Sequence, residues 1–290
     1  MTPEVVVIDV HSVDLHDALV RFVPKVFAGA SFREWYDGGG WEPGYRAFAL
    51  FDGPDVIANV SVRQMSLVVQ GVRLRGWQLG AVGVLPELRG RGLQHVLMPR
   101  VLAAIGASDP VFLYANDEVL DFYPKFGFRR ALEWVFAVEH SIEPTASSLR
   151  RLSLDSDGDH RLLARIAADA LPVTSQFGAE RYGSGLLWHW ANVHPHDFYY
   201  HANDDAIVVA EEDFEVLRIC DVLASKPIEL HAYLPQLVTR PTHHVEFGFT
   251  PERYWREARA SCEYLESSLF VRGEMTLPTS EFKFPVLAQA

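Results

Sequence analysis

The hydrophobic pattern at the start of the chain predicts a helix, a loop and then a run of strands. Apolar residues recur at helical spacing from Val13 to Phe27, behind Ser12 as a plausible capping residue. The aromatic, glycine-rich stretch over residues 32–45 predicts a loop. Three β-branched, apolar runs follow, and the turn dipeptides between them indicate an antiparallel meander. These runs cover residues 47–51, 56–69 and 72–84.

Beyond the meander, the pattern alternates between helix and strand. The predicted elements are a helix over residues 92–105, a strand over 111–115, a short helix over 118–125 and a strand over 132–138. Pro99 falls inside the first of these helices. Because proline lacks an N–H and clashes with the preceding turn, we expect a kink or a broken turn between His95 and Pro99. The mixed order predicts an α+β fold with a mostly antiparallel sheet flanked by helices.

A change in composition divides the chain. Residues 141–158 are rich in Ser, Thr, Pro and Asp and are interpreted as a linker between a domain over residues 1–140 and a second over 159–290. The second half has a helical pattern and then strand patterns, in an order that loosely echoes the first half. These predicted elements are a helix over residues 160–170 and strands over 206–211, 214–224 and 244–249.

Length and charge narrow the classes of function. The chain has 290 residues, enough for about two domains, and 49% of them are hydrophobic, which argues against disorder. The net charge is −12, from 38 acidic and 26 basic side chains. A nucleic-acid-binding surface needs a basic field, so nucleic acid is disfavoured as a partner. The oligomeric state stays open, and a homo-oligomer is compatible with the sequence.

Cysteine use and the N-terminus favour a cytoplasmic location. Cys220 and Cys262 are too few for a disulfide framework and lack the spacing of a thiolate metal site. The first residues include several acids and no uninterrupted apolar core, which argues against a signal peptide. No apolar run is long enough to span a membrane, so no membrane partner is expected.

A strand, a glycine- and arginine-rich loop and a helix start stand together in the stretch from Gly80 to Ala104. The loop Arg-Gly-Arg-Gly occupies residues 89–92, directly after a strand ending at Val84. The start of a helix presents unpaired N–H groups and a partial positive charge, and glycines let the backbone approach phosphate oxygens. This order indicates a pyrophosphate site, although it matches neither a Walker loop nor a dinucleotide fingerprint. The simpler alternative is a basic loop that only links strand and helix.

A second motif follows the strand over residues 111–115. It reads N-x6-Y-x-K-x-G-F, and its fixed residues are Asn116, Tyr123, Lys125, Gly127 and Phe128. Together with the R-x-x-G loop after the V-G-V strand, it resembles the GNAT superfamily of N-acetyltransferases over roughly residues 1 to 140. The resemblance implies acetyl-CoA as co-substrate, no metal, and an amine acceptor that is a small molecule, polyamine-like or an aminoglycoside, or a protein.

The resemblance also implies roles for individual residues. The strand at Val84 would separate from its neighbour to admit the pantetheine arm, and the Val84 N–H would polarise the thioester carbonyl. Tyr123 would protonate the leaving thiolate, with a core aromatic side chain as the alternative. Asn116 would touch the pantetheine or cap a helix. The implied coenzyme-binding residues are Val82, Gly83, Val84, Arg89, Gly90, Arg91, Gly92, Leu93, Gln94, His95 and Asn116.

The acceptor side is less defined. Gln78 occupies the position where many family members carry a carboxylate base, and an amide cannot act as a base. Trp35, Tyr36 and Trp41 stand among acidic residues and suit a cationic amine, or else they form a rim against the second half. Gln78 also supports a rival hypothesis, a non-catalytic acyl-CoA-binding sensor.

The second half lacks a comparable loop, and we interpret it as a degenerate GNAT-like domain. Tandem GNAT proteins of this kind include aminoglycoside acetyltransferases of the enhanced-intracellular-survival type. In that group the terminal carboxylate reaches the active site, which would assign this role to Ala290. A histidine-rich stretch over residues 189–201 is interpreted as a packing or solvated cluster, and no metal is expected.

Overall fold

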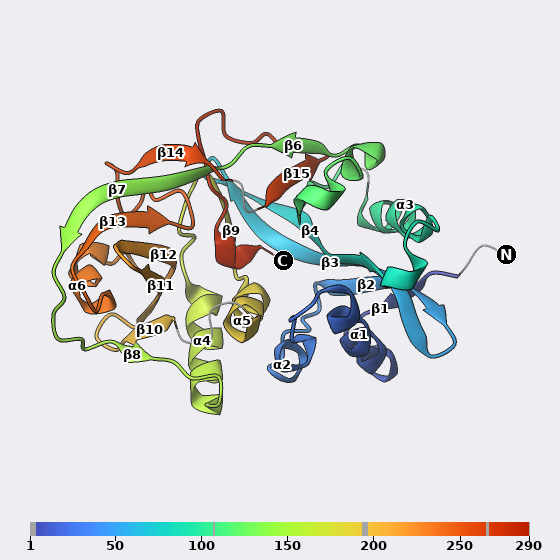
Figure 1. Cartoon of the computed structure of the whole chain (residues 1–290), viewed down its shortest axis with the longest axis horizontal. Coiled ribbons are helices and arrows are strands. Elements are labelled where there is room, and N and C mark those ends of the chain that lie inside the picture. Colours follow the sequence, from blue (N-terminus) through green and yellow to red (C-terminus); the bar gives the residue numbers. More distant parts are fainter. Residues whose placement is uncertain (1–3, 107, 193–196, 265–266, 290) are drawn as a thin grey trace.

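The computed structural model describes residues 4–106, 108–192, 197–264 and 267–289, and it contains two sheets with helices packed between and around them (Figure 1). Within these residues the first sheet has eight strands in the order β1-β2-β3-β4-β5-β15-β6, with β9 also paired to β3. These strands are β1 (Val6–Ile8), β2 (Tyr45–Asp52), β3 (Asp55–Val69), β4 (Val72–Val84), β5 (Val111–Ala115), β6 (Arg129–Ala131), β9 (Phe177–Glu180) and β15 (Ser268–Arg272).

The second described sheet has seven strands in the order β14-β7-β13-β12-β11-β10-β8. They are β7 (Trp134–Ile142), β8 (Arg150–Arg151), β10 (Phe198–His201), β11 (Ala206–Asp213), β12 (Val216–Leu223), β13 (Thr242–Phe247) and β14 (Arg259–Glu263). Each sheet is mostly antiparallel with one parallel pair near its middle, β4 with β5 in the first and β12 with β13 in the second. The predicted fold class is confirmed.

Helices cover both faces of the first sheet. The described α-helices are α1 (Val13–Val26), α2 (Phe32–Asp37), α3 (Leu93–Ile105), α4 (Asp157–Asp169), α5 (Gly183–Asn192) and α6 (Leu234–Leu237). Short 3-10 turns are η1 (Pro86–Leu88), η2 (Asp117–Val119), η3 (Tyr123–Phe126), η4 (Leu230–Ala232) and η5 (Val286–Ala288). Alternation along β2 explains the two layers: Ala47 packs on the side of α1, whereas Phe48 packs on the side of α3.

One hydrophobic core continues from the first half into the second. It joins residues of α1 and α2 to α4 and α5 and to the C-terminal segment, including Phe22, Trp35, Leu163, Trp190 and Leu287. Figure 1 shows α4 and α5 between the two sheets. The two halves are therefore packed together through a shared apolar interior.

The division of the strands between the two sheets does not follow the predicted boundary at residue 140. Strand β7, which spans that boundary, pairs with β13 and β14 in the second sheet. Conversely β15, from near the C-terminus, pairs with β5 and β6 in the first sheet. The first half thus supplies β7 to the second sheet, and the second half supplies β9 and β15 to the first. The predicted linker contains the end of β7 and all of β8.

Three local expectations were wrong. The aromatic stretch contains α2, because Phe32 and Trp35 lie one helical turn apart and are both buried. Helix α3 runs without interruption through Pro99, which faces solvent while Leu97 and Met98 beside it are fully buried. The short helix expected over residues 118–125 is instead the two turns η2 and η3, the second containing Pro124 near its start, where a missing N–H costs nothing.

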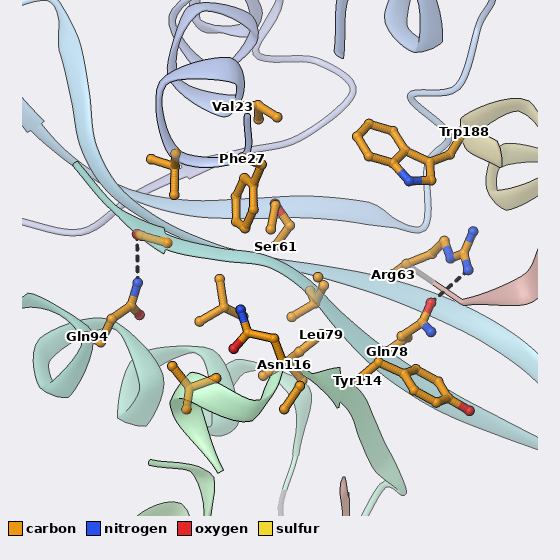
Figure 2. Close-up of a pocket in the computed structure, with 18 of the residues that line it drawn as sticks. Val23, Phe27, Ser61, Arg63, Gln78, Leu79, Gln94, Tyr114, Asn116 and Trp188 are labelled. Atoms are coloured by element: carbon orange, nitrogen blue, oxygen red, sulfur yellow. Dashed lines mark hydrogen bonds between the residues drawn. The ribbon is translucent and has the colours of Figure 1, made fainter. Parts of the chain in front are cut away.

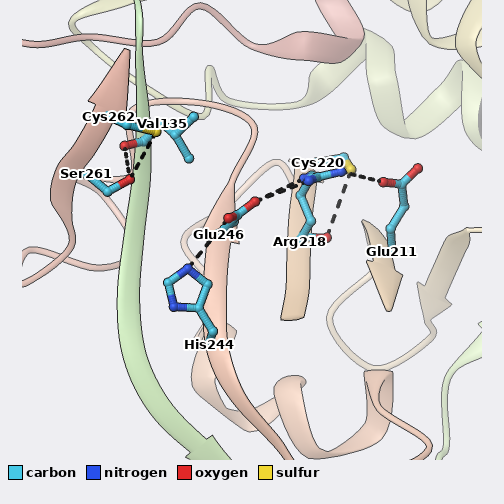
Figure 3. Close-up of polar contacts among 8 residues, drawn as sticks. All are labelled: Val135, Glu211, Arg218, Cys220, His244, Glu246, Ser261 and Cys262. Carbon is cyan, nitrogen blue, oxygen red and sulfur yellow. Dashed lines mark hydrogen bonds and ion pairs between the residues drawn. The ribbon is translucent and has the colours of Figure 1, made fainter. Parts of the chain in front are cut away.

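Polar contacts also cross the second sheet. Arg218 on β12 forms ion pairs with Glu211 on β11 and with Glu246 on β13, and His244 contacts Glu246 (Figure 3). Cys220, two residues after Arg218, is buried, whereas Cys262 on β14 is exposed. Both cysteines are free thiols in the described structure.

Candidate functional site

The centre of the candidate site is a gap between the two parallel strands of the first sheet. Strands β4 and β5 pair only from Trp77 with Val111 to Leu79 with Leu113, although β4 continues for five more residues to Val84. The predicted separation of these strands is therefore present. Beyond Leu79, one edge of β4 has no strand partner among the described residues.

The unpaired edge of β4 carries the N–H of Val84. Leu85 N–H donates to the carbonyl of Ile57 on β3 at 3.0 Å, and Val84 lies opposite Ala58. Because hydrogen-bonded and non-hydrogen-bonded pairs alternate in an antiparallel ladder, the Val84 N–H points away from β3 and toward the gap. A backbone donor therefore faces the gap at the position that the sequence indicated.

A bulge in β4 turns the strand at the same place. The β3–β4 register shifts between Asn59 and Ser61, and Ala81 has a φ of 47°. The buried Asn59 amide donates to the Ala81 carbonyl at 3.0 Å and to Ser61 Oγ at 2.9 Å. Asn59 on β3 thus stabilises the bulge in β4 through its hydrogen bond to Ala81.

The loop before α3 has the backbone of an anion site. Gly90 and Gly92 have φ values of 77° and 76°, a region that favours glycine, and a Cβ at either position would meet no atom within 4 Å. Gly92 caps α3, whose first turn contains no acidic residue. The helix N-terminus therefore presents its N–H groups and partial positive charge beside the exposed Arg89 and Arg91.

Gln94 connects this helix to the strand gap. Its amide nitrogen donates to the Gly83 carbonyl at 2.8 Å (Figure 2) and to the Asn59 carbonyl at 3.0 Å. The family pattern has a small residue at this position, and here the longer side chain braces α3 against β3 and β4. His95, next in the chain, is exposed and packs beside Phe122 and Phe126, with ring centroids 5.9 and 5.5 Å away.

A cavity of about 600 Å³ runs along this gap. In Figure 2, Gln94 lies at one end of the lining and Arg63, Gln78 and Trp188 lie at the other. Its size is that of an ordinary ligand pocket. The lining residues from the predicted set are Trp35, Gln78, Val82, Gly83, Val84, Arg89, Gln94, Asn116 and Tyr123, whereas Gly90, Arg91, Gly92, Leu93, His95, Tyr36 and Trp41 are not among them.

Tyr123 reaches the cavity from the side opposite α1. The residue is only 5% exposed, and burial raises the pKa of its hydroxyl to about 12, so the phenol stays protonated at neutral pH. Its ring also contacts Phe128 and Phe270, so the core role and the cavity role coexist. Asn116 stands at the start of η2 but makes no capping hydrogen bond with its side chain, which leaves its amide available to the cavity.

The other end of the cavity is built around a buried arginine. Arg63 is 5% exposed, and one of its nitrogens donates to Gln78 Oε1 and to the Ala288 carbonyl, both at 2.8 Å. Tyr45 and Ser61 complete this end with a hydroxyl–hydroxyl bond of 2.7 Å. Burial lowers the pKa of Arg63, because a desolvated cation is disfavoured.

The predicted acceptor aromatics separate into two groups. Trp35 lines the cavity and donates its ring N–H to the Ser184 carbonyl on α5 at 2.9 Å. Trp41 instead stacks on His16 at 3.9 Å, and the Tyr36 hydroxyl bonds the same imidazole at 3.1 Å. Tyr36 and Trp41 therefore pack α2 against α1, and only Trp35 both touches the second half and faces the cavity.

Sequence reasoning missed Arg63 and Asn59, and although it expected the second half to shape the acceptor cleft, it did not identify the residues of the wall that this half contributes. That wall consists of Ser184, Gly185 and Trp188 on α5. A signal was present for β3: residues 59, 61 and 63 are polar and alternate with Val60 and Val62, so their side chains share one face. Nothing local in the sequence places α5 or the C-terminal segment beside that face.

Other expectations concern groups outside the cavity. Among the described residues, no group of three His, Cys, Asp or Glu side chains is placed to hold a metal. His194 and His196 of the histidine-rich stretch lie outside the described residues, as does Ala290. In the part of the chain that the structure describes, no helix is both long and apolar enough to cross a membrane.

Comparison with known proteins agrees with the geometry. Residues 17–131 match the model of an acetyltransferase (GNAT) domain, so the first half of the chain carries a GNAT domain. No curated protein matches the chain.

Solved structures extend the likeness to most of the chain. A protein from Enterococcus faecalis, described as a probable N-acyltransferase, covers 93% of this chain and is itself covered over 72%, with 12% identity and a TM-score of 0.56. A GCN5-related N-acetyltransferase from Kribbella flavida covers 93%, with 71% of its own length matched, 17% identity and a TM-score of 0.54. Eis1 from Mycobacterium abscessus covers 92%, with 73% of its own length matched, 16% identity and a TM-score of 0.54. At these identities the likeness establishes a shared fold across both halves.

Proposed function

We propose that this protein is an acetyl-CoA-dependent N-acetyltransferase in which an amine attacks the thioester directly. The observation that carries the proposal is the continuous cavity from Arg89 and Gln94, at the start of α3, through the β4–β5 gap to Gln78. The coenzyme and the amine would enter this cavity from opposite ends. Their reacting groups would meet in the gap.

The coenzyme end follows from charge and backbone geometry. The pyrophosphate would bind the N–H groups at residues 90–95, with Arg89 and Arg91 adding charge-assisted bonds. The pantetheine amides would pair with the free edge of β4 in place of a strand. Asn116 would contact the same arm from the other side.

Two groups would assist the chemistry in the gap. The N–H of Val84 would donate to the thioester oxygen as negative charge develops there. Tyr123 would donate a hydrogen bond to the leaving sulfur. Because its pKa of about 12 lies above the ~8.5 of an ordinary thiol, hydrogen bonding describes this role better than net proton transfer.

The chain offers few bases for the amine. Gln78 is an amide already bonded to Arg63, and Glu118 is the sole carboxylate among the described lining residues, exposed at η2. We infer that the amine enters neutral, having lost its proton to water. Holding amine and thioester together can supply on the order of 7–11 kcal/mol of the barrier, so a dedicated base is not required for useful rates.

The second half would act as a degenerate GNAT-like domain that closes the acceptor end. Its sheet repeats the arrangement of the first, with three antiparallel strands followed by one parallel pairing and a register shift near residue 209. Ser184, Gly185 and Trp188 on α5 supply part of the cavity wall. This half therefore supports and shapes the site rather than duplicating it.

The proposal is tested by coenzyme binding and turnover. Calorimetry should give saturable binding of acetyl-CoA at one site per chain. Thiol release from acetyl-CoA should then rise when amines from a panel of polyamines, aminoglycosides and lysine peptides are added. Absence of coenzyme binding would refute the proposal.

The second candidate is a non-catalytic acyl-CoA-binding sensor, and the replacement of a carboxylate by Gln78 favours it. The same experiment separates the two. Tight coenzyme binding with no thiol release on any amine would support the sensor.

A further inference from the structure

We propose that the end of the cavity around Arg63 is a carboxylate-binding site. It would recognise a carboxylate carried either by the amine acceptor or by the acyl group of the coenzyme. This inference rests on the proposed function and adds the chemical class of the substrate. The favoured acceptor thereby becomes an amino acid or a peptide rather than a polycation.

The first argument is that Arg63 is a buried charge without an ion pair. Its described hydrogen bonds go to an amide oxygen, a backbone carbonyl and the Met65 sulfur, and none of the ion pairs among described residues includes it. Removing a cation from water costs several kcal/mol unless an opposite charge compensates it. A bound carboxylate would supply that charge.

Glu42 is the one carboxyl group, among the described residues, whose charge acts on Arg63. It makes no ion pair with the guanidinium, and its own burial raises its pKa. A desolvated carboxyl at a distance compensates Arg63 only in part. The remaining positive charge would favour an anion in the cavity.

The second argument is that the guanidinium lines the cavity with unused donors. Its described hydrogen bonds all come from Nη2, while Nε is buried and has no partner. Gly185 on α5 packs directly against Nη1, because a Cβ at that residue would lie 2.6 Å from this nitrogen, so the guanidinium keeps its place only beside a glycine. The bonds to Gln78 and Ala288 fix the plane of the group, which suits planar carboxylate recognition.

The position of Arg63 constrains the substrate. Arg63 and Gln78 are paired across β3 and β4, six residues before Val84. At roughly 3.3 Å per residue, the six residues from Gln78 to Val84 span at most about 20 Å along the strand. The bulge in β4 and the reach of the Arg63 side chain shorten the distance between the guanidinium and the Val84 N–H. An amine separated from its carboxylate by several bonds, such as the ε-amine of lysine, fits this spacing better than an α-amine.

A purely structural role is the alternative. Arg63 joins β3 to the C-terminal segment through the Ala288 carbonyl, and it could serve only as that link. The two roles differ in one measurable respect. A structural link affects all substrates equally, whereas a carboxylate site discriminates between a carboxylate and its neutral amide.

The experiment compares isosteric ligands that differ only in this charge. The acceptors are ε-aminocaproate and its amide, assayed with acetyl-CoA. The acyl arm compares succinyl-CoA with succinamoyl-CoA, its neutral amide, on a simple alkylamine. We expect the carboxylate ligand of one arm to be favoured in kcat/KM by roughly 10- to 100-fold, the range of a charge-assisted hydrogen bond, and the arm that shows it identifies the carrier.

Binding of the N-acetyl products, measured by calorimetry with coenzyme A present, repeats the acceptor test without turnover. If the protein binds no coenzyme A, the proposed function is refuted. The carboxylate preference is a separate quantity, the ratio of the affinities for the carboxylate product and its amide. Arg63→Gln should abolish the preference, and Arg75→Gln, an exposed arginine at the start of β4, should retain it. If Arg63→Gln does not fold, Gly185→Ala displaces the guanidinium without removing its charge.

Equal affinity for carboxylate and amide in the unaltered protein, in both arms, would overturn the proposal. A preference that survives in Arg63→Gln would overturn it as well, because the discrimination would then belong to another group.

Discussion

The two sheets share a topology but differ at the end of their parallel pair. In the first sheet, β4 and β5 part after Leu79, and a cavity of about 600 Å³ occupies the gap. In the second sheet, the pairing of β12 with β13 ends at Ile219 and Phe247, and the chain itself fills the space beyond. Gly248 donates to the Ile219 carbonyl, and Val286 of η5 donates to the Gly248 carbonyl, both at 2.9 Å.

The segments that follow the central strands also differ. After β4 come two glycines in the left-handed region and α3, with 13 residues. After β12 come a glycine-free loop and α6, with 4 residues. A helix of one turn presents neither the dipole nor the N–H array that a pyrophosphate needs. The two sheets thus share a frame and differ in one loop and one helix start, which under the proposed function would decide which gap takes the coenzyme.

The largest effect is expected from Gly92→Glu, which should leave no measurable acetyl-CoA binding by calorimetry. A non-glycine residue is strained at a φ of 76°, and the new carboxylate would repel the pyrophosphate. Gly53→Glu is the matched control, since Gly53 has a φ of 58°, equally open space and a place in the distant β2–β3 turn. Normal affinity in Gly92→Glu would show that this helix start is not the coenzyme site.

The C-terminal segment that borders the second gap through Val286 can be weakened by Leu287→Ala. Leu287 is fully buried, so its truncation should lower the free energy of unfolding by about 2–5 kcal/mol, measured by denaturant titration. Leu132→Ala, at a half-exposed leucine, should change it by less than about 0.5 kcal/mol. A loss at Leu287 no larger than that of the control would mean that Leu287 does not anchor the C-terminal segment beside the second gap.

Tyr123→Phe tests whether the first gap is catalytic. We expect kcat to fall by roughly 10- to 100-fold, because a hydrogen bond to the leaving sulfur is lost, with coenzyme affinity unchanged. Tyr36→Phe removes a hydroxyl that bonds His16 outside the cavity and should leave kcat unchanged. Equal kcat in Tyr123→Phe and the unaltered protein would remove the hydroxyl from the chemistry.

The smallest effect separates the two arginines of the loop. Arg89 lines the cavity and Arg91 does not, so Arg89→Gln should weaken coenzyme binding by roughly 10-fold and Arg91→Gln by less than about 3-fold. Both losses should shrink at high salt, because exposed charges are screened. The reverse ranking would indicate that the loop holds the pyrophosphate in another orientation.

Much of the first half could be predicted because its signals are local. The runs that became β2, β3 and β4, and the turns between them, are visible in alternating apolar residues and in Asp52-Gly53 and Gln70-Gly71. The loop at residues 89–92 was recognisable because a left-handed backbone and a helix start require particular residue types. Helix α2 was missed because glycines and other aromatic residues obscured the helical spacing of Phe32 and Trp35. Only their burial in the tertiary structure distinguishes these two from the other aromatic residue of that helix.

By itself, the sequence determined the strands β2 to β5 and the glycine- and arginine-rich loop before α3, since backbone conformation and strand alternation depend on neighbours in the chain. Only the tertiary structure decided that β7 and β15 exchange sheets and that α5 and the C-terminal segment close the acceptor end. It also decided that Arg63 is a buried cation beside Gln78. Contacts such as Arg63 with Ala288 join residues more than two hundred positions apart, and no local pattern encodes which distant surface will remove a charge from water.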